Sequence, residues 1–145
     1  MQISSRFTIA IHMLTCMEVF KKEYKITSSF LAGSIQVNPV VIRKLLMQLK
    51  KAGLVQVRRG PGGALLSKAP KDITFLEVYR AVECVEDNTL FHFHENPNPE
   101  CPVGKRIHKL LDGNLARVQD AMERELASIT LADVLKDYKK SLELS

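Results

Sequence analysis

The sequence of 145 residues predicts a mainly helical protein that carries one small β-hairpin. Three observations lead to this fold class. Apolar residues recur at threes and fours in several segments, which is the spacing of a buried helix face. A β-prone run over residues 54–59 is followed by the turn residues GPGG and a second short apolar run. With 46% hydrophobic and 26% charged residues, the composition suits a globular protein that buries a core.

The first expected helix covers residues 5–20. It carries two adjacent apolar stripes, so we expect it to be buried on two sides. A short helix over residues 29–34 follows it, and Thr27 or Ser28 can serve as the N-cap because both have a hydroxyl that accepts a backbone hydrogen bond.

The next helix is expected over residues 39–52. Asn38 is a strong N-cap and Pro39 is favoured at the first helical position. Gly53 suits the left-handed residue that often ends a helix. The expected buried stripe consists of Ile42, Leu45, Leu46 and Leu49. Two short helices joined by a tight turn predict a helix-turn-helix, and the hairpin that follows makes it a winged one.

Three further helices are expected, over residues 74–82, 102–128 and 131–140. The long one carries an apolar stripe made of Val103, Ile107, Leu110, Leu111, Asn114, Leu115, Val118, Met122 and Leu126. A single helix of this length that projects from a small domain cannot bury such a stripe by itself. The alternative is that the helix folds back on its own domain. Pairing with the same helix of a second copy is the simplest solution, because most oligomers are two-fold symmetric. We therefore expect a homodimer.

These elements divide the chain into three parts. Residues 1–83 are expected to form the winged helix-turn-helix domain, residues 84–101 a connector loop that could act as a sensor, and residues 102–145 the dimerisation helix and a C-terminal helix.

The net charge of +5 is divided unevenly between the two halves of the chain. Residues 1–71 carry 12 Lys/Arg and two acids, a net +10, whereas residues 72–145 carry 9 Lys/Arg and 14 acids, a net −5. A basic half joined to an acidic half is typical of nucleic-acid binding coupled to a separate assembly or regulatory part.

The basic half offers what recognition of double-stranded DNA requires, namely charge for phosphates and a helix that can present side chains to base edges. In the helix expected over residues 39–52, the buried stripe leaves an outward face that consists of Val40, Arg43, Lys44, Met47, Gln48 and Lys51. A valine at its start could touch a thymine methyl group and an arginine could pair with guanine. Arginines on the narrow hairpin suit the minor groove, whose negative potential is strong. The candidate DNA-binding residues are Ser28, Ser29, Asn38, Pro39, Val40, Val41, Arg43, Lys44, Arg58, Arg59, Gly60 and Gly62.

The segment KAGLVQVRRGPGGALLSKAPKDITFLEVYRAVE, residues 51–83, resembles the signature of the bacterial Rrf-type regulators, the family that includes IscR, NsrR and CymR. The segments SSRFTIAIHML, NPVVIRKLL and SITLADVL fit the same pattern, so the resemblance covers nearly the whole chain and is nearest to the short YwnA-like members. It implies a homodimer that pairs through the long helix, binds a palindromic operator and usually represses transcription. The chain departs from the family pattern at Ala64, where an aromatic residue is typical, and at Arg43, where several cluster-binding members have an acid. We therefore expect a different operator.

The resemblance also bears on cofactors. Cluster-binding members hold iron and sulfide with three closely spaced cysteines before the long helix, and a histidine three residues past the last cysteine can be the fourth ligand. Cys101 resembles that last cysteine, but Gly104 stands in the place of the fourth ligand. One thiolate cannot hold an iron–sulfur cluster, which takes about four protein ligands. We expect no cofactor of this kind.

Other uses of the connector loop stay open. Cys84, His92, His94 and Cys101 offer two thiols and two imidazoles, a ligand set that zinc or another divalent metal accepts, although their spacing is not that of structural zinc sites. A packed loop without metal is the alternative. Thiol sensing is a third, with Cys101 ahead of Cys84, because a helix start and neighbouring cations favour the thiolate.

The function predicted from these features is a sequence-specific DNA-binding transcriptional regulator. The alternatives are a winged-helix module that binds protein, and a cysteine-dependent enzyme, which only the residue types support. The sequence shows no signal-peptide cleavage site, no apolar run of membrane length and too few cysteines for a disulfide framework. We expect a cytoplasmic protein that does not associate with membranes.

Overall fold

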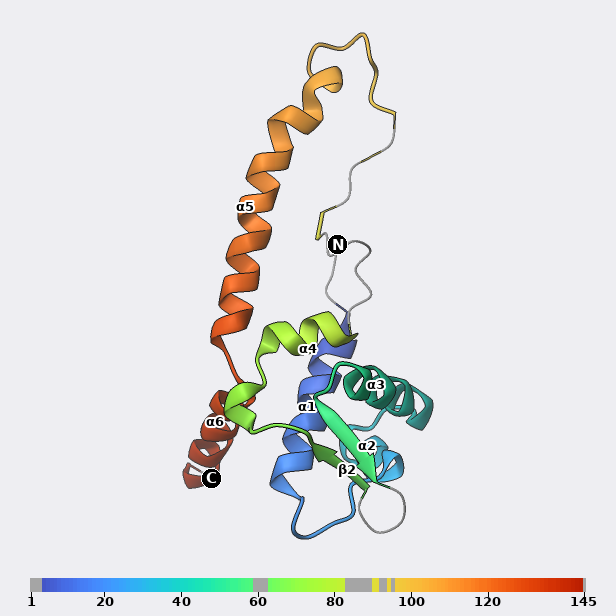
Figure 1. The fold of residues 1–145 in the computed structure, drawn as a ribbon, viewed down its shortest axis with the longest axis vertical. Coiled ribbons are helices and arrows are strands. Elements are labelled where there is room, and N and C mark those ends of the chain that lie inside the picture. Colours follow the sequence, from blue (N-terminus) through green and yellow to red (C-terminus); the bar gives the residue numbers. More distant parts are fainter. Residues whose placement is uncertain (1–3, 59–62, 83–89, 92–93, 95, 145) are drawn as a thin grey trace.

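The computed structural model describes residues 4–58, 63–82, 90–91, 94 and 96–144 (Figure 1). The helices are α1 (Ser5–Val19), α2 (Ser28–Ile35), α3 (Pro39–Lys51), α4 (Phe75–Val82), α5 (Ile107–Ser128) and α6 (Leu131–Glu143). The strands β1 (Val55–Arg58) and β2 (Gly63–Leu66) form an antiparallel hairpin. Short 3-10 turns cover η2 (Pro70–Asp72) and η4 (Gly104–Arg106). The predicted fold class, mainly helical with one small β-hairpin, is confirmed.

Side-chain caps fix the starts of the two helices of the helix-turn-helix. Thr27, and not Ser28, caps α2, because its hydroxyl oxygen accepts a hydrogen bond from the backbone N–H three residues further on, at 3.0 Å. The side-chain oxygen of Asn38 caps α3 by accepting a hydrogen bond from the Val40 N–H at 2.8 Å, and Pro39 is the first residue of that helix. Beyond α3, Gly53 has a φ of +79° and takes the left-handed conformation expected of it. These local signals set the length and direction of α3.

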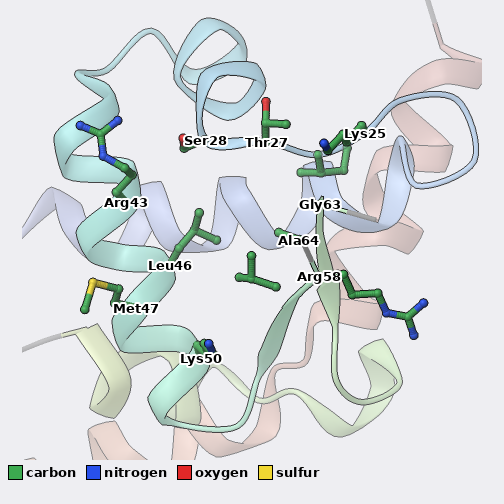
Figure 2. Close-up of a pocket in the computed structure, with 12 residues that line it drawn as sticks. Lys25, Thr27, Ser28, Arg43, Leu46, Met47, Lys50, Arg58, Gly63 and Ala64 are labelled. Atoms are coloured by element: carbon green, nitrogen blue, oxygen red, sulfur yellow. The ribbon is translucent and has the colours of Figure 1, made fainter. Parts of the chain in front are cut away.

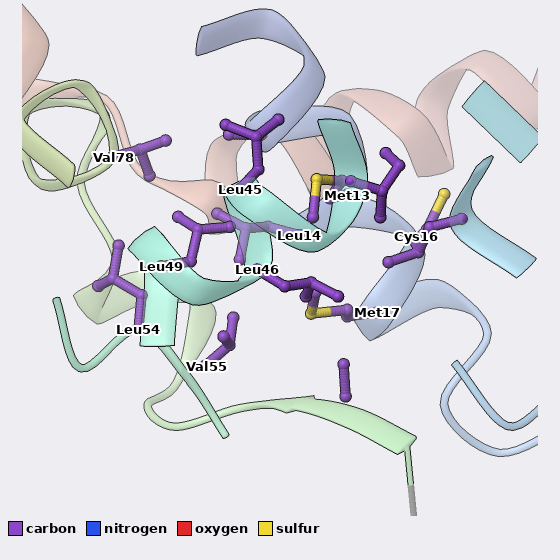
Figure 3. Packing of buried hydrophobic residues seen from close by; sticks show 14 of the residues in the cluster. Met13, Leu14, Cys16, Met17, Leu45, Leu46, Leu49, Leu54, Val55 and Val78 are labelled. Carbon is purple, nitrogen blue, oxygen red and sulfur yellow. The ribbon is translucent and has the colours of Figure 1, made fainter. Parts of the chain in front are cut away.

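The hydrophobic core lies where α1 meets α3 and the hairpin (Figure 3). Figure 3 shows the side chains of α1 on one side, the apolar stripe of α3 on the other and Val55 of β1 closing the cluster below them. The largest fully buried side chains are Met13, Leu14, Met17, Ile26, Leu31, Ile42, Leu45, Leu49, Leu54, Ile73, Leu131 and Val78. All four residues of the stripe predicted for α3 are buried. Burial of this stripe orients the opposite face of α3 towards solvent.

The C-terminal helix packs against the winged domain. The Phe75 N–H donates to the Ile129 carbonyl and the Leu131 N–H donates to the Ile73 carbonyl, both at 2.9 Å. Leu131 is buried in the same cluster as the residues of α1 and α3. Figure 1 shows α6 beside α1, on the side of the domain away from α3. The two backbone hydrogen bonds therefore fix the lower end of α5 to the start of α4.

The predicted boundaries of the last two helices are wrong by a few residues. The sequence placed the start of the long helix at Pro102, but residues 104–106 form the turn η4 and α5 begins at Ile107. Arg106 has φ −114° and ψ 4°, which are not helical values, so it separates the turn from α5. The C-terminal helix continues to Glu143 and not only to Lys140. Apolar spacing does not detect either difference, because a single turn has no periodicity of its own.

Helix α5 projects from the rest of the molecule (Figure 1), and its apolar side chains are exposed or only half-buried. It has 22 residues and none of them is buried; at 1.5 Å per residue its length is about 33 Å. Leu110 and Val118 are each 52% exposed. Its end near α4 carries an ion pair between Arg80 and Glu123, with 3.8 Å between the nitrogen and the oxygen. The residues that the structure describes therefore leave most of this helix without a cover.

Candidate nucleic-acid interface

The outward face of α3 combines exposed apolar side chains with cations. Val40 is 59% exposed and Met47 is 72% exposed, so neither contributes to the core. Arg43 and Lys44 are exposed on the same side of the helix. Large apolar side chains in water are unfavourable, although single ones are common on protein surfaces. Here Val40 and Met47 lie on one face of a basic helix. A helix that enters the major groove presents such a face, with apolar side chains for thymine methyl groups and cations for phosphates.

The candidate residues predicted from the sequence gather at the start of α2, along α3 and at the end of β1. Ser28 is half-buried and Ser29 is exposed. The remaining described candidates are all exposed: Asn38, Pro39, Val40, Val41, Arg43, Lys44 and Arg58. Arg59, Gly60 and Gly62, which the sequence assigned to the tip of the hairpin, lie outside the described residues. The structure brings Ser28, Arg43 and Arg58 to the rim of one hollow.

This hollow lies between α3 and the hairpin and has a volume of about 470 Å³. Figure 2 shows α3 along one side, the hairpin strands along the other and the start of α2 closing one end. We call it the α3–hairpin hollow. Its lining among the described residues is Lys25, Ile26, Thr27, Ser28, Arg43, Leu46, Met47, Lys50, Val57, Arg58, Gly63 and Ala64, and these include four cations and no carboxylate. A concave surface of this charge is suited to an anion.

Sequence reasoning missed Lys25 and Lys50 as residues of this surface, and it placed Met47 on the outward face of α3 without counting it among the candidate contacts. The spacing of Arg43, Met47 and Lys50 at i, i+4 and i+7 is a signal that all three lie along one side of α3. The hairpin folds back towards this side of α3, and Lys25 closes one end of the hollow. Both are tertiary features, which no local sequence pattern contains.

The sequence placed Gln48 on the outward face of α3, and this is wrong. Gln48 is half-buried, and its Oε1 is shielded from solvent and has no hydrogen-bond partner among the residues that the structure describes. Lys50, which the sequence left out of the outward set, is exposed. Both residues lie at the borders of the buried stripe, where a helical wheel alone does not decide which side a neighbouring element covers. Contacts between α3 and α4 cover part of the helix surface.

The hairpin is held to the start of α2 through backbone atoms. The Ala64 N–H donates to the Ile26 carbonyl at 2.8 Å. The preceding residue, Gly63, has a φ of +62°, and a Cβ atom there would lie 2.7 Å from the Ile26 carbonyl oxygen. Two features of this position therefore require glycine: the left-handed backbone conformation and the close approach to the Ile26 carbonyl oxygen. This contact fixes the distance between the hairpin and α3 across the α3–hairpin hollow.

The connector loop places Cys101 and His94 at the surface, with Cys101 half-buried and His94 exposed. Hydrogen bonds from the backbone N–H groups of Gly104 and Val103 lower the pKa of the Cys101 thiol, because they stabilise the thiolate. Cys16, by contrast, is buried in the core, and its sulfur lies 3.5 Å from the Ser34 hydroxyl oxygen.

The described residues of this loop do not fit an iron–sulfur cluster. Cys101 is the one thiol that the described part of the loop offers, whereas a cluster takes about four protein ligands. A Cβ atom at Gly104 would lie 2.7 Å from the Asn98 carbonyl oxygen, so a larger residue in the place of the family's fourth ligand requires the loop to move. Within the described residues, no group of three or more His, Cys, Asp or Glu side chains could hold a metal ion. Cys84 and His92, which belong to the ligand set considered for zinc, lie outside those residues.

No helix in the described part of the chain is both long and apolar enough to cross a bilayer.

Comparison with known proteins identifies the family. A family model described as Rrf2, an iron-dependent transcriptional regulator, matches residues 3–137. The HTH-type transcriptional regulator YwnA of Bacillus subtilis strain 168 is 49% identical over 133 residues, which are 92% of this chain and 96% of that protein. A crystal structure described as that of a DNA-binding protein is 43% identical, with a TM-score of 0.70 over 90% of this chain and 99% of that one. IscR of T. potens is 24% identical, with a TM-score of 0.72 over 97% of this chain and 90% of that one, and shows the same fold.

These relatives confirm the function class predicted from the sequence, which is DNA-binding transcriptional regulation and not enzymatic catalysis. The family model and YwnA each match more than nine-tenths of the chain. The chain belongs to the Rrf2 family of transcriptional regulators.

Proposed function

We propose that this protein is a homodimeric repressor that binds a palindromic DNA operator in the bacterial cytoplasm. In this proposal α3 enters the major groove and the hairpin enters the adjacent minor groove, which is how a winged helix-turn-helix contacts a duplex. The observation that supports it most strongly is the outward face of α3, where exposed apolar side chains and cations lie opposite a fully buried stripe. A repressor of this kind acts by occupying DNA that the transcription machinery needs.

The contacts divide into those that read bases and those that hold phosphates. Val40 and Val41, at the start of α3, reach thymine methyl groups, and Arg43 donates to guanine. Phosphates are contacted by Lys44, Ser28 and Ser29. The side-chain NH2 group of Asn38, whose oxygen caps α3, also contacts a phosphate. Arg58 and Arg59 enter the minor groove, with Pro39, Gly60 and Gly62 giving the backbone its shape at the two contact points.

The dimer is formed through α5 in this proposal. The helix exposes Leu110 and Val118, which lie about 12 Å apart along its axis. Arg117 and Arg124 flank Val118 together with Asp120, so the surface carries both charge signs beside its apolar strip. A two-fold axis would bring such a surface against its own copy and allow each acid to meet a cation. Two winged domains held in this way contact two half-sites of one operator.

A signal input at the connector loop completes the proposal. The loop precedes α5, and the Leu90 N–H donates to the Gln119 side-chain oxygen at 3.0 Å, so loop and dimer helix are in contact. The Cys101 thiol, whose pKa is lowered, is the group in the described loop that is suited to react with an oxidant or an electrophile. A metal held by Cys84, His92, His94 and Cys101 is the other form of input considered for this loop.

The variant Arg43→Ala tests the base-reading role of α3. Loss of one good contact to a base edge costs about 1–3 kcal/mol, so we expect operator affinity to fall by roughly 10- to 100-fold and base preference at one position to relax. Fluorescence anisotropy with a labelled operator duplex, at several salt concentrations, measures both the affinity and the salt dependence.

Lys71→Ala is the matched control, because it removes the same charge from an exposed residue of η2 that does not line the α3–hairpin hollow. It should leave affinity within about twofold of the wild type. If both variants fold and bind as the wild type does, and binding is insensitive to salt, the protein does not bind DNA through α3. A winged-helix module that binds protein would then be the better description.

A further inference from the structure

The α3–hairpin hollow contains two lysines that none of the proposed base or minor-groove contacts uses. Lys25 precedes α2, and Lys50 lies in the last turn of α3. Both are exposed, and neither takes part in an ion pair found among the described residues. Together with Arg43 and Arg58 they surround a floor of apolar side chains that includes Leu46 and Ala64 (Figure 2).

The geometry of a duplex determines what faces this hollow. The major groove and the adjacent minor groove of B-DNA are separated by one sugar–phosphate strand. If α3 occupies the first and the hairpin occupies the second, the strand between them must cross the surface that separates α3 from the hairpin. That surface is the α3–hairpin hollow. This step rests on the proposed function.

The chemistry of the hollow matches such a strand. Deoxyribose presents C–H groups and the phosphodiester presents negative oxygens, so an apolar floor with a cationic rim is complementary to both. None of the described residues that line the hollow is a carboxylate that would repel the phosphates. Figure 2 shows Lys50 at one end of the hollow and Lys25 at the other end, opposite Arg43, while the Arg58 side chain extends away from α3.

We propose that the α3–hairpin hollow holds the sugar–phosphate strand between the two grooves, and that Lys25 and Lys50 bind its phosphates. These lysines set the position of the winged domain on the duplex and do not read sequence. The backbone contact between Ala64 and Ile26 keeps the hollow at a fixed width, because it ties the hairpin to the start of α2. The two lysines are thus positioning residues for the reading of bases by the start of α3.

The test compares Lys50→Ala with Lys71→Ala. Both lysines are exposed, and each change removes one positive charge. Only Lys50 lines the hollow, whereas Lys71 belongs to η2 and not to α3. Lys25→Ala and Lys22→Ala form a second matched pair, because Lys22 is exposed in the same connecting segment but lines a different hollow, between α1 and α6.

The measurement is the slope of log affinity against log salt concentration, for the full-length protein and a duplex recovered by selection from random sequences. We expect Lys50→Ala and Lys25→Ala each to reduce the slope by about 1 per subunit, because one phosphate contact is lost. The reduction should be the same on duplexes that differ in base sequence. Lys71→Ala and Lys22→Ala should leave the slope unchanged.

Duplexes with a single neutral methylphosphonate, placed in turn along one half-site, locate the contact. One position should weaken binding of the wild-type protein by several-fold and have no effect on Lys50→Ala. If the wild type binds DNA but the members of each pair behave alike, the role of the hollow is wrong while the proposed function stands. If the wild type binds no duplex at any salt concentration, the proposed function fails and this proposal fails with it.

Discussion

Replacing Leu110 and Val118 together by glutamate is expected to convert the dimer to monomers and to weaken operator binding by about 100-fold or more. Both side chains are 52% exposed in the single chain, so the change adds charge at a surface and does not disturb the core of the subunit. In a two-fold interface the same change places four carboxylates in an apolar seam, where an unpaired buried charge costs several kcal/mol. Loss of the dimer removes the gain that comes from binding two half-sites at once.

Sedimentation or light scattering gives the mass, and anisotropy gives the affinity. Ala116→Glu is the matched control, because Ala116 is exposed on α5 but lies on the side of the helix opposite Val118. It should remain a dimer and bind as the wild type does. A double variant that stays dimeric would show that α5 is not the seam, and a monomer with unchanged affinity would show that dimerisation does not serve operator binding.

Gly63→Ala is expected to destabilise the fold and to weaken DNA binding at least tenfold. The left-handed conformation, with φ +62°, costs an alanine about 1–2 kcal/mol. In addition, the new methyl group would lie 2.7 Å from the Ile26 carbonyl oxygen, so the hairpin must move away from the start of α2. Moving the hairpin changes its placement relative to α3, and a loss of 1.4 kcal/mol is already a tenfold loss in affinity.

Gly53→Ala separates these two effects. Gly53 has a φ of +79°, so the conformational cost is similar, but a Cβ atom there meets nothing within 4 Å. We expect Gly53→Ala to lower the free energy of unfolding by about 1 kcal/mol and to leave DNA affinity unchanged. Urea denaturation and anisotropy on the two variants give the comparison. Equal losses of DNA affinity would mean that the close approach of Gly63 to Ile26 does not position the hairpin.

Local chemistry explains which features could be predicted from the sequence. Asn38 with Pro39 predicted the start of α3, and Gly53 predicted its end, because a cap needs only the residues next to it. The spacing of four apolar residues predicted the buried stripe of α3. The start of α5 was misplaced at Pro102, because the turn η4 before Ile107 leaves no mark on apolar periodicity.

The interface was harder to predict, because it is formed by contacts between elements. Arg43 and Arg58 were predicted singly, as basic residues on a helix and on a hairpin. Lys25 and Lys50 join them only because the hairpin folds back towards α3 and is tied to Ile26, which is a tertiary contact. The burial of Gln48 depends likewise on its surroundings in the fold, and a helical wheel that contains α3 alone assigns it to the solvent.

Selection of binding sequences from a pool of random duplexes tests the central claim most directly. The full-length protein is mixed with the pool, bound duplexes are recovered over several rounds, and their sequences are determined. We expect one two-fold symmetric motif, with half-site centres separated by one DNA turn of about 34–36 Å or by a multiple of it. Recovery of no enriched sequence, or of a motif without two-fold symmetry, would contradict the account of a dimer that reads a palindromic operator through α3.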